Sequence, residues 1–425
     1  MSIITSRNKF AVTLTAAVAA ATMALSGCGS SGAASGDSDS KSSGSSSAFV
    51  FGGLWPQTGT LAYLYPPEEA GYKLAIKDIN DAGGVLGKKV TSVDADTSDA
   101  DHADQNASAA QSVLSKKPSV VIGPAASGVV KNTYKTFEAA KIPIISMGST
   151  SADFSGLSPY FFRTVAPDAV QGAVMGQLIA QDGVKNLAIA AFNDPYGTGL
   201  RDTVAKTAKA AGVNIVYGEK DAFDPTETNF SSIATAIKAA NPDATLIVSY
   251  DQSKPLIKAL AAAGVDTHKL YLVDGNTVDF SKDFQPGLIS GAKGTIPGGH
   301  PTEDFVKQLK AQVPDMKDTT YAAETYDAAI LAALAAQKGG KTDGETVKKN
   351  LPAVSGANGG TKCTSYKDCL ALLKDGKDIE YQGQAGIGPF NADHDPSTAS
   401  IGIYKYDADN KPVFDHAQQG AVPKK

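Results

Sequence analysis

The chain has 425 residues, with 39 Lys and Arg against 44 Asp and Glu, a formal net charge of -5 and 42% hydrophobic residues. This length exceeds what one ordinary hydrophobic core holds, so two domains are expected. The balanced charge, without a basic block beyond the extreme N-terminus, argues against a nucleic-acid partner, and the 42 glycines fit a globular α/β protein.

The N-terminus predicts an exported lipoprotein. Arg7 and Lys9 precede an Ala-rich apolar stretch from Phe10 to Leu25, and Leu25-Ser26-Gly27-Cys28 then resembles the end of a bacterial lipoprotein signal. The stretch is too short and too weakly apolar for a comfortable membrane span, so a spanning helix is the less favoured alternative. We expect residues 1–27 to be a signal peptide that is removed, and Cys28 to be lipidated and to anchor the protein to the lipid bilayer, outside the cytoplasm.

Residues 28–48 predict a lipidated Cys followed by a flexible tether, because Gly29 to Ser47 contain Gly, Ser, Ala, Asp and Lys but no large apolar side chain. Two further cysteines, Cys363 and Cys369, have five residues between them. In an oxidising compartment a disulfide that closes this small loop is favoured. A metal pair or a catalytic thiol is less favoured, since no His or additional Cys lies nearby in the sequence.

The first part of the chain alternates between predicted strands and helices. Strands are expected at Phe49–Leu54, Lys89–Asp96, Val120–Ile122, Ile142–Ile145 and Tyr160–Val165. Helices are expected at Glu68–Asp81, Ala103–Leu114, Val129–Ala140 and Val170–Ala180. Hydroxyl-bearing turns follow two of the neighbouring strands, and in a parallel sheet such turns meet at the edge where α/β folds bind ligands.

The same alternation then begins again. Strands are expected at Asn186–Phe192, Asn214–Tyr217, Ala244–Ser249 and Lys269–Val273, and helices at Leu200–Ala211, Phe230–Ala240 and Lys254–Ala263. Further helices are expected at Glu303–Gln312, Tyr321–Gln337 and Glu345–Leu351, and closing strands at Gly386–Phe390, Ala399–Tyr406 and Pro412–Phe414. Two successive sets of strand-helix units predict an α/β fold with two doubly wound parallel sheets.

Motifs of enzymes and of cofactor sites are missing. No G-x-G-x-x-G follows a strand, Val129 stands where a P-loop needs Lys, no G-x-S-x-G occurs, and the five histidines are scattered. The acidic run from Asp94 to Asp104 imitates a calcium loop, but Asp99 replaces the turn glycine and Gln105 the bidentate Glu. We therefore predict no enzyme, no cofactor and no metal, with a calcium site as a weaker alternative to a solvated turn.

A binding cleft for a zwitterion fits the polar residues at the strand ends. Ser127 and Thr150 offer hydrogen-bond donors for a carboxylate, and Asp274 offers an anion for an ammonium. Aromatic side chains near other strand ends supply an apolar wall: Trp55, Tyr63, Tyr65, Tyr196 and Tyr250. Singly, each has a plainer interpretation, namely a helix cap or turn residue for the polar positions and a packing residue for each tyrosine.

From Phe49 to the C-terminus the chain resembles the type I periplasmic, or solute-binding, proteins of ABC importers, in the branched-chain amino acid class. The segments that carry the resemblance are GTLAYLYPPEEAGYKLAIKDINDAGGVLGKKV (59–90), SVVIGPAASG (119–128), IPIISMGSTS (142–151), YFFRTVAPDAVQG (160–172), FNDPYGTGL (192–200) and TYDAAILAAL (325–334). The combination of IKDIN-x-x-GG with FFRT-x-x-x-D-x-x-QG is the most specific part.

The resemblance implies two lobes joined by three crossing segments, with the ligand between them. Residues 49–167 and 298–385 would form lobe 1, and residues 168–297 and 386–425 lobe 2. By this resemblance Ser127, Gly148 and Thr150 would anchor the ligand carboxylate, Asp274 would face the ammonium, and Tyr196 and Tyr250 would form the wall. Ser149, in the same turn, is also predicted to bind the ligand. Trp55, Tyr63 and Tyr65 complete the predicted set of ligand-binding residues.

The function that the resemblance implies is capture of an amino acid, branched-chain or otherwise apolar, by a monomeric lipid-anchored protein that delivers it to ABC permease subunits. Lobe closure by a hinge motion is expected. A sensing receptor with the same cleft is an alternative. So is a ligand such as urea, a short amide or an aromatic acid, since relatives bind these.

Overall fold

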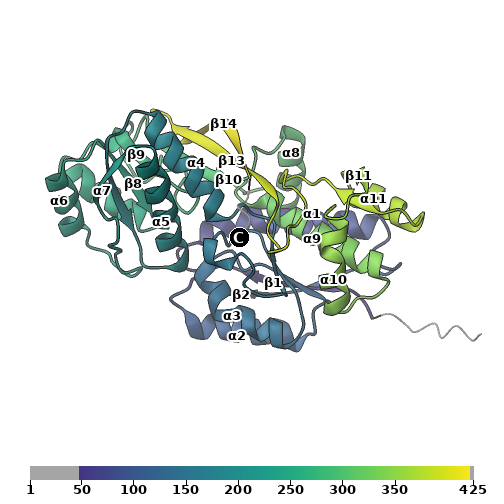
Figure 1. Cartoon of the computed structure of the whole chain (residues 1–425). Coiled ribbons are helices and arrows are strands. Elements are labelled where there is room, and N and C mark those ends of the chain that lie inside the picture. The colour runs from purple at the N-terminus through teal and green to yellow at the C-terminus, as the bar shows by residue number, and fades with distance from the viewer. Residues whose placement is uncertain (1–46, 422–425) are drawn as a thin grey trace, which may run out of the picture. The chain divides into compact units, whose positions relative to one another are not determined.

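The first sheet of the structure, a computed structural model that describes residues 47–421, is parallel throughout (Figure 1). Its strand order is β2-β1-β3-β4-β5. The strands are β1 (Val50–Trp55), β2 (Thr91–Asp96), β3 (Val120–Ile122), β4 (Ile144–Ser146) and β5 (Phe161–Arg163). Strands β3, β4 and β5 are buried at every position, which explains their continuous apolar and β-branched runs.

Helices from two distant parts of the chain cover this sheet. The early ones are α1 (Tyr65–Asp81), α2 (Ala103–Ser115) and α3 (Ser127–Ala139). The late ones are α8 (Glu303–Gln312), α9 (Ala322–Gly339), α10 (Gly344–Val354) and α11 (Tyr366–Lys374), with the short paired strands β11 (Thr361–Cys363) and β12 (Ile379–Tyr381). Helix α9 packs between α1 and α10 and against β3 and β4, so its residues from Ala322 to Ala336 are all buried, with Glu324 and Asp327 among them. We call these elements together with the first sheet the first body.

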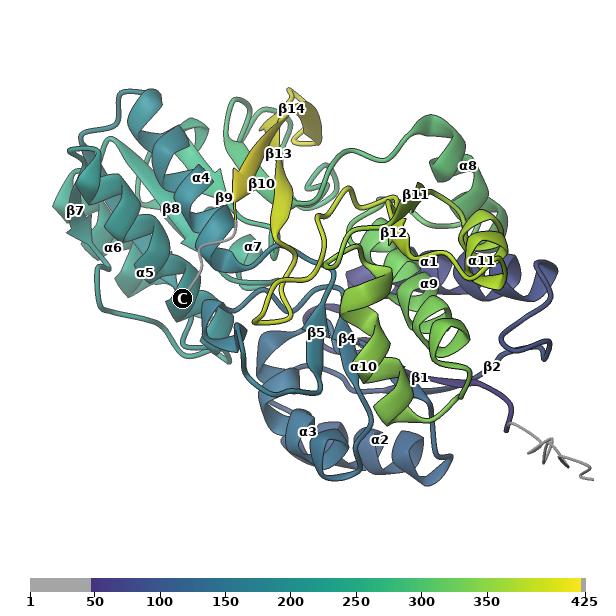
Figure 2. The ribbon, with the colours of Figure 1, turned by 45° about the vertical axis from the view of Figure 1, so that its right-hand side comes forward.

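The second sheet has the strand order β14-β13-β10-β9-β8-β6-β7 (Figure 2). Its strands are β6 (Asn186–Ala191), β7 (Asn214–Tyr217), β8 (Ala244–Val248), β9 (Leu270–Leu272), β10 (Lys293–Pro297), β13 (Thr398–Tyr406) and β14 (Pro412–Ala421). Helices α4 (Asp168–Gln181), α5 (Pro195–Ala210), α6 (Ser231–Ala240) and α7 (Ser253–Ala262) belong to it. We call this set the second body. The predicted α/β fold is confirmed, and the second sheet carries in addition an antiparallel edge formed by β13 and β14.

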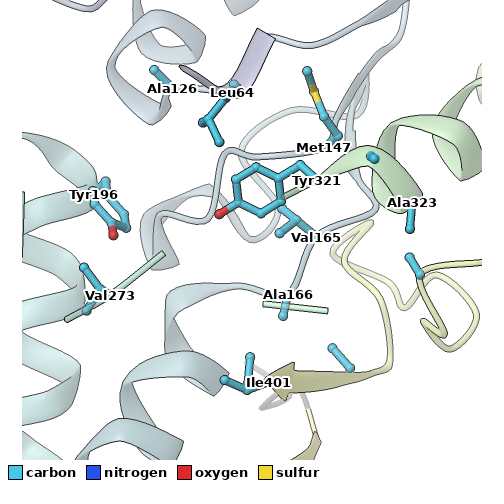
Figure 3. Close-up of a cluster of buried hydrophobic side chains, with 14 of the residues drawn as sticks. Leu64, Ala126, Met147, Val165, Ala166, Tyr196, Val273, Tyr321, Ala323 and Ile401 are labelled. Atoms are coloured by element: carbon cyan, nitrogen blue, oxygen red, sulfur yellow. The ribbon is translucent and has the colours of Figure 1, made fainter. Parts of the chain in front are cut away.

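The chain passes between the two bodies after β5, after β10 and after β12. Buried apolar side chains from both bodies form one connected cluster, with Leu64 from the first body and Tyr196 and Val273 from the second (Figure 3). The polar residues at the carboxyl ends of the two sets of strands are thereby brought together at this junction.

A few sequence predictions differ from the structure. The segment 386–390 is not a strand, since only an isolated bridge joins Phe390 to Pro396, and Gly388 and Pro389 interrupt the pattern that a ladder requires. Strands β10, β11 and β12 and helix α11 were not predicted; the Gly and Pro residues within β10 hide its strand character. Cys363 at the end of β11 forms a disulfide with Cys369 in α11, which confirms that prediction.

The predicted signal peptide, the lipidation site Cys28 and nearly all of the tether lie outside the described residues. Within residues 47–421, the structure has no helix that is both long and apolar enough to cross a membrane.

Candidate ligand-binding site

The Ser127 hydroxyl connects the two turns that follow β3 and β4. Helix α3 starts at Ser127, and the preceding Ala126 has an extended backbone and no side-chain cap. Ser127 Oγ accepts hydrogen bonds from Ser149 Oγ and from the backbone N–H of Ser151, each at 3.2 Å. Ser127 is therefore not a helix-capping residue; it holds the second turn next to the N-terminus of α3, whose first N–H groups have no partners within the helix.

Arg163 supports the turn after β4, on the side of that turn away from the cavity. This fully buried side chain at the end of β5 forms an ion pair with Asp395 at 2.6 Å, and Asp395 lies in the third crossing segment. The Arg163 guanidinium also donates to the carbonyl oxygens of Ser149 (3.2 Å) and Ser151 (2.8 Å). A guanidinium with several planar donors suits this role, and it leaves a positive charge behind the turn.

Thr150 and Asp168 face each other behind the same turn. The backbone N–H of Asp168 donates to the Thr150 carbonyl at 2.7 Å, and the Thr150 hydroxyl lies beside the Asp168 carboxylate without a well-formed hydrogen bond to it. Burial, with Asp274 as the next cause, raises the pKa of Asp168 well above its usual range. Asp168 opens α4 and was not among the predicted ligand-binding residues.

Asp274 presents a buried carboxylate in the turn after β9. Its Oδ1 accepts hydrogen bonds from Gln171 Nε2 at 2.8 Å and from the Tyr196 hydroxyl at 2.7 Å, and its Oδ2 accepts one from the Tyr321 hydroxyl. Burial raises the pKa of Asp274, and the three donors oppose that rise. All of these partners within the described residues are uncharged, so the ionised carboxylate is solvated only by neutral groups, an unfavourable state that a cation would relieve.

Two stacked tyrosines form an aromatic wall beside Asp274. The rings of Tyr196 and Tyr250 have centroids 5.5 Å apart and planes inclined by 8°. Tyr196 is positioned by Asp194, the N-cap of α5, whose Oδ1 accepts the Tyr196 backbone N–H at 2.8 Å. The sequence Asn193-Asp194-Pro195 thus fixes both the start of α5 and the tyrosine that contacts Asp274.

These side chains surround a small, narrow cavity between the bodies. It is lined by Leu61, Leu64, Ala125, Ser127 and Gly148 from the first body, by Tyr196, Tyr250, Asp274 and Gly275 from the second, and by Tyr321 at the start of α9. The structure therefore brings five of the ten predicted ligand-binding residues, from both bodies, to one cavity.

The other predicted residues lie elsewhere. Ser149 and Thr150 are buried in the second turn, next to the cavity lining. Tyr63 reaches across the junction, where its hydroxyl donates to the Gly275 carbonyl at 2.9 Å. Tyr65 donates to Glu69 within α1. Trp55 is a core residue.

The indole of Trp55 turns away from the cavity because the last position of β1 faces α1. Its ring packs against Tyr72 with a centroid distance of 4.8 Å, and its Nε1 donates to Asp94 at 3.2 Å. A strand-end position alone did not reveal which face the side chain would take, since successive residues of a strand alternate between faces.

Tyr321 was missed by the sequence analysis. Its φ of 60° is in the left-handed region, which is uncommon for a bulky residue. Figure 3 shows its hydroxyl directed toward Tyr196 and Val273. No local pattern marks this position, because the residue before a helix reaches the site only through the packing of α9 against the first sheet.

The acidic run after β2 serves the neighbouring loop. Asp96 accepts hydrogen bonds from the Thr58 hydroxyl at 2.7 Å and from the Gln57 N–H at 3.0 Å, and Asp99 accepts the Thr60 N–H at 3.1 Å. Within residues 47–421 no group of three or more potential metal ligands gathers at one point. The run is best described as a structural support for the loop at residues 57–60.

Residues 49–368 match the family described as periplasmic binding protein. The chain belongs to this family. It is 25% identical over 305 residues to the leucine-, isoleucine-, valine-, threonine- and alanine-binding protein of Pseudomonas aeruginosa, which covers 70% of this chain and 80% of that protein. It is 28% identical over 317 residues to Leu/Ile/Val-binding protein homolog 1 of Brucella suis, with the same coverage of 70% and 80%.

Solved structures agree on the fold. The substrate-binding protein LivJ of Streptococcus pneumoniae, in complex with isoleucine, aligns with a TM-score of 0.71 and 21% identity over 88% of this chain and 100% of that chain. A solute-binding protein of R. palustris in complex with 4-hydroxybenzoate aligns with a TM-score of 0.69 and 18% identity over 88% and 97%. The prediction of a type I periplasmic binding protein of the branched-chain class is confirmed, and its relatives are binding proteins of transporters rather than enzymes.

Proposed function

We propose that this periplasmic binding protein captures an α-amino acid in the cavity between its two bodies. The ligand carboxylate meets Ser127 and the turn after β4, the ammonium meets Asp274, and the side chain faces Leu64 and the tyrosines. The observation that carries the proposal is the buried Asp274 carboxylate, which has only uncharged donors within the described residues and faces a hydroxyl-rich turn across one cavity. Relatives named for amino acids that they bind support it.

The side chain of the ligand is proposed to begin with an apolar portion. Leu61, Leu64 and Ala125 line the cavity on the first-body side, and the ring faces of Tyr196 and Tyr250 line it on the other. Such walls favour branched-chain or straight aliphatic groups close to the α-carbon. An aromatic acid without an amine, like the ligand of the R. palustris protein, would leave Asp274 without a cation.

The direct test is a thermal-shift and calorimetric screen that compares leucine with 4-methylpentanoate, which has the same chain and carboxylate but no amine. A ligand bound only by the folded protein raises the melting temperature. We expect leucine to bind and Asp274→Asn to weaken it by about 10- to 100-fold, as for a hydrogen bond to a charged group, with little effect on 4-methylpentanoate.

The matched control for this test is Asp279→Asn, which changes an exposed carboxylate in the same loop region. It should leave both affinities unchanged. Equal losses for leucine and 4-methylpentanoate in Asp274→Asn would refute the ammonium role. Tight binding of benzoates by the unaltered protein, with no response to amino acids, would favour an aromatic acid as the ligand.

The proposal extends to transport. Two lobes close over the ligand by a hinge motion: residues 49–167 with 298–385 form one, and residues 168–297 with 386–425 form the other. The loaded protein then delivers the ligand to ABC permease subunits. The family supports a location outside the cytoplasm. Lipidation at Cys28 tethers the protein there, and mass spectrometry of the mature N-terminus should find a lipid-modified Cys28 that Cys28→Ser removes.

A further inference from the structure

Tyr321 lines a second cavity as well as the candidate site. This second cavity is small and is lined on the first-body side by Tyr321, Ala323 and Glu324, and on the second-body side by Ile296 and Tyr404 among others. The two cavities thus share a wall. Because Tyr321 lines both cavities, a ligand side chain that extended past its ring would point toward the second cavity.

Glu324 is the charged group of the second cavity. Only 5% of the residue is exposed, and the one hydrogen-bond donor to its carboxylate found in the described residues is its own backbone N–H. Gly298 in the second crossing segment packs closely on it, since a Cβ there would lie 2.3 Å from Glu324 Oε1. Burial raises the pKa of Glu324 to about 8. A buried carboxylate with only this one donor is costly to keep ionised unless a ligand supplies another.

Further acidic groups act on one another and on Tyr404 in the lining of the second cavity. Glu68 on α1 is fully buried, and neither of its carboxylate oxygens has a hydrogen-bond partner in residues 47–421. Besides burial, the surface carboxylate Asp318 raises the pKa of Glu68, and Asp318 together with Glu324 raises that of Tyr404. The charged neighbours that act on these groups are all anionic, so the local potential favours a cation.

We infer that the second cavity receives the far end of the ligand side chain, and that this end carries an amine which donates to Glu324. The inference rests on the proposed function, since the α-ammonium and the carboxylate of the same ligand occupy the Ser127–Asp274 cavity. An unbranched aliphatic stem lies against Leu61, Leu64 and the Tyr321 ring. The ligand class is therefore α-amino acids with a straight chain that ends in an amine, of which lysine is the common representative.

The test compares lysine with norleucine, which has the same four-carbon chain without the amine, by calorimetry on the full chain. We expect lysine to bind about 10- to 100-fold more tightly, as for a hydrogen bond to a charged group. Norleucine bound as tightly as lysine, or more so, would overturn the inference and leave the proposed function intact. If neither compound nor leucine bound, the proposed function would fail, and this inference with it.

Glu324→Gln identifies the group responsible. It keeps the shape of the side chain and should remove the preference for lysine while norleucine binding stays unchanged, which also verifies that the variant is folded. Glu303→Gln, at an exposed position at the start of α8, is the matched control and should keep the preference. A preference for lysine that survives Glu324→Gln would overturn the assignment to Glu324.

Discussion

The two sides of the candidate site differ in charge and in what holds them. On the first-body side, Ser127 and the turn after β4 offer hydroxyls, and the buried Arg163 stands behind the turn. On the second-body side, Asp274 offers a carboxylate in front of two stacked tyrosines. A dipolar ligand has one preferred orientation between such faces. The placement of the charges therefore sets the orientation of the ligand, and the apolar lining decides only which side chain fits.

The sides also differ in where their support comes from. The first-body turn is fixed by its own neighbours and by Asp395 of the third crossing segment. Asp274 is instead held by donors from both bodies, since Tyr196 and Gln171 belong to the second body and Tyr321 to the first. Loss of the buried Arg163 support should therefore affect stability most, and changes to groups that face the cavity or span the junction should affect binding most.

The largest effect is expected from Arg163→Ala. It leaves Asp395 as a buried charge without its partner and removes two donors from the turn carbonyls. Breaking a buried ion pair in this way typically costs about 3–5 kcal/mol of unfolding free energy. Urea unfolding followed by circular dichroism measures the loss.

Lys209→Ala serves as its control, because Lys209 pairs with Glu219 on the surface, where both side chains are about half exposed. Exposed ion pairs contribute less than roughly 1 kcal/mol to the free energy of unfolding. Similar losses in the two variants would contradict the view that Arg163 is the main support of the turn.

A smaller effect, on binding rather than folding, is expected from Ser127→Ala. The variant removes the hydroxyl that accepts from Ser149 and Ser151, and with it one proposed donor to the ligand carboxylate. Leucine affinity should fall by about 10-fold, whereas leucinamide, which lacks the carboxylate charge, should lose less. Calorimetry with both ligands checks this. Ser112→Ala on the exposed face of α2 is the control, and parallel losses for both ligands would argue for a purely structural hydroxyl.

Much of this comparison could be read from the sequence. Strand β3 and helix α8 match their predicted bounds, and Ser127, Asp274 and Tyr250 reach one cavity because the carboxyl ends of parallel strands share an edge of each sheet. These three site residues could be predicted because each stands in a turn directly after a predicted strand or at the start of the helix that follows it.

The rest depends on packing between distant segments. Tyr321 precedes a late helix that returns to the first sheet, so nothing in its own neighbourhood in the sequence connects it to Asp274. Gln171 reads as one position of a buried helix, and its amide becomes relevant only once the turn after β9 lies beside α4. Trp55 shows the converse, since a residue at a strand end can still belong to the core.

The pH dependence of stability tests the support of the aromatic wall. Burial, outweighing the hydrogen bond from Tyr196 N–H, raises the pKa of Asp194 to about 6 from an ordinary value of 3.8. The folded protein then holds this proton more tightly than the unfolded chain. The contribution of Asp194 to the free energy of unfolding is therefore greatest below pH 4, and it falls by about 1 kcal/mol per pH unit as the pH rises from 4 to 6.

Asp194→Asn keeps an oxygen acceptor for the cap of α5 but does not titrate. Its melting temperature should therefore fall less between pH 4 and pH 6 than that of the unaltered protein, and the two curves should run parallel above pH 7. Exposed Asp202→Asn, on the same helix, is the control and should reproduce the parent curve. A parent-like slope in Asp194→Asn would assign the pH dependence to other carboxyls.

The smallest effect is expected at a hydrogen bond that joins the two bodies without involving Asp274. The Tyr63 hydroxyl of the first body donates to the Gly275 carbonyl of the second at 2.9 Å. Tyr63→Phe removes this hydrogen bond, which is worth about 0.5–1.5 kcal/mol. Because the proposed closure brings the two bodies together over the ligand, the variant should weaken leucine binding by roughly 2- to 10-fold, with little change in the free energy of unfolding. Tyr65→Phe is a close control, because the Tyr65 hydroxyl bonds to Glu69 within α1 and spans no junction. Equal affinities in the two variants would mean that contact between the bodies at Gly275 does not contribute to ligand capture, and the difference between the two sides would then reside in Asp274 and Ser127 alone.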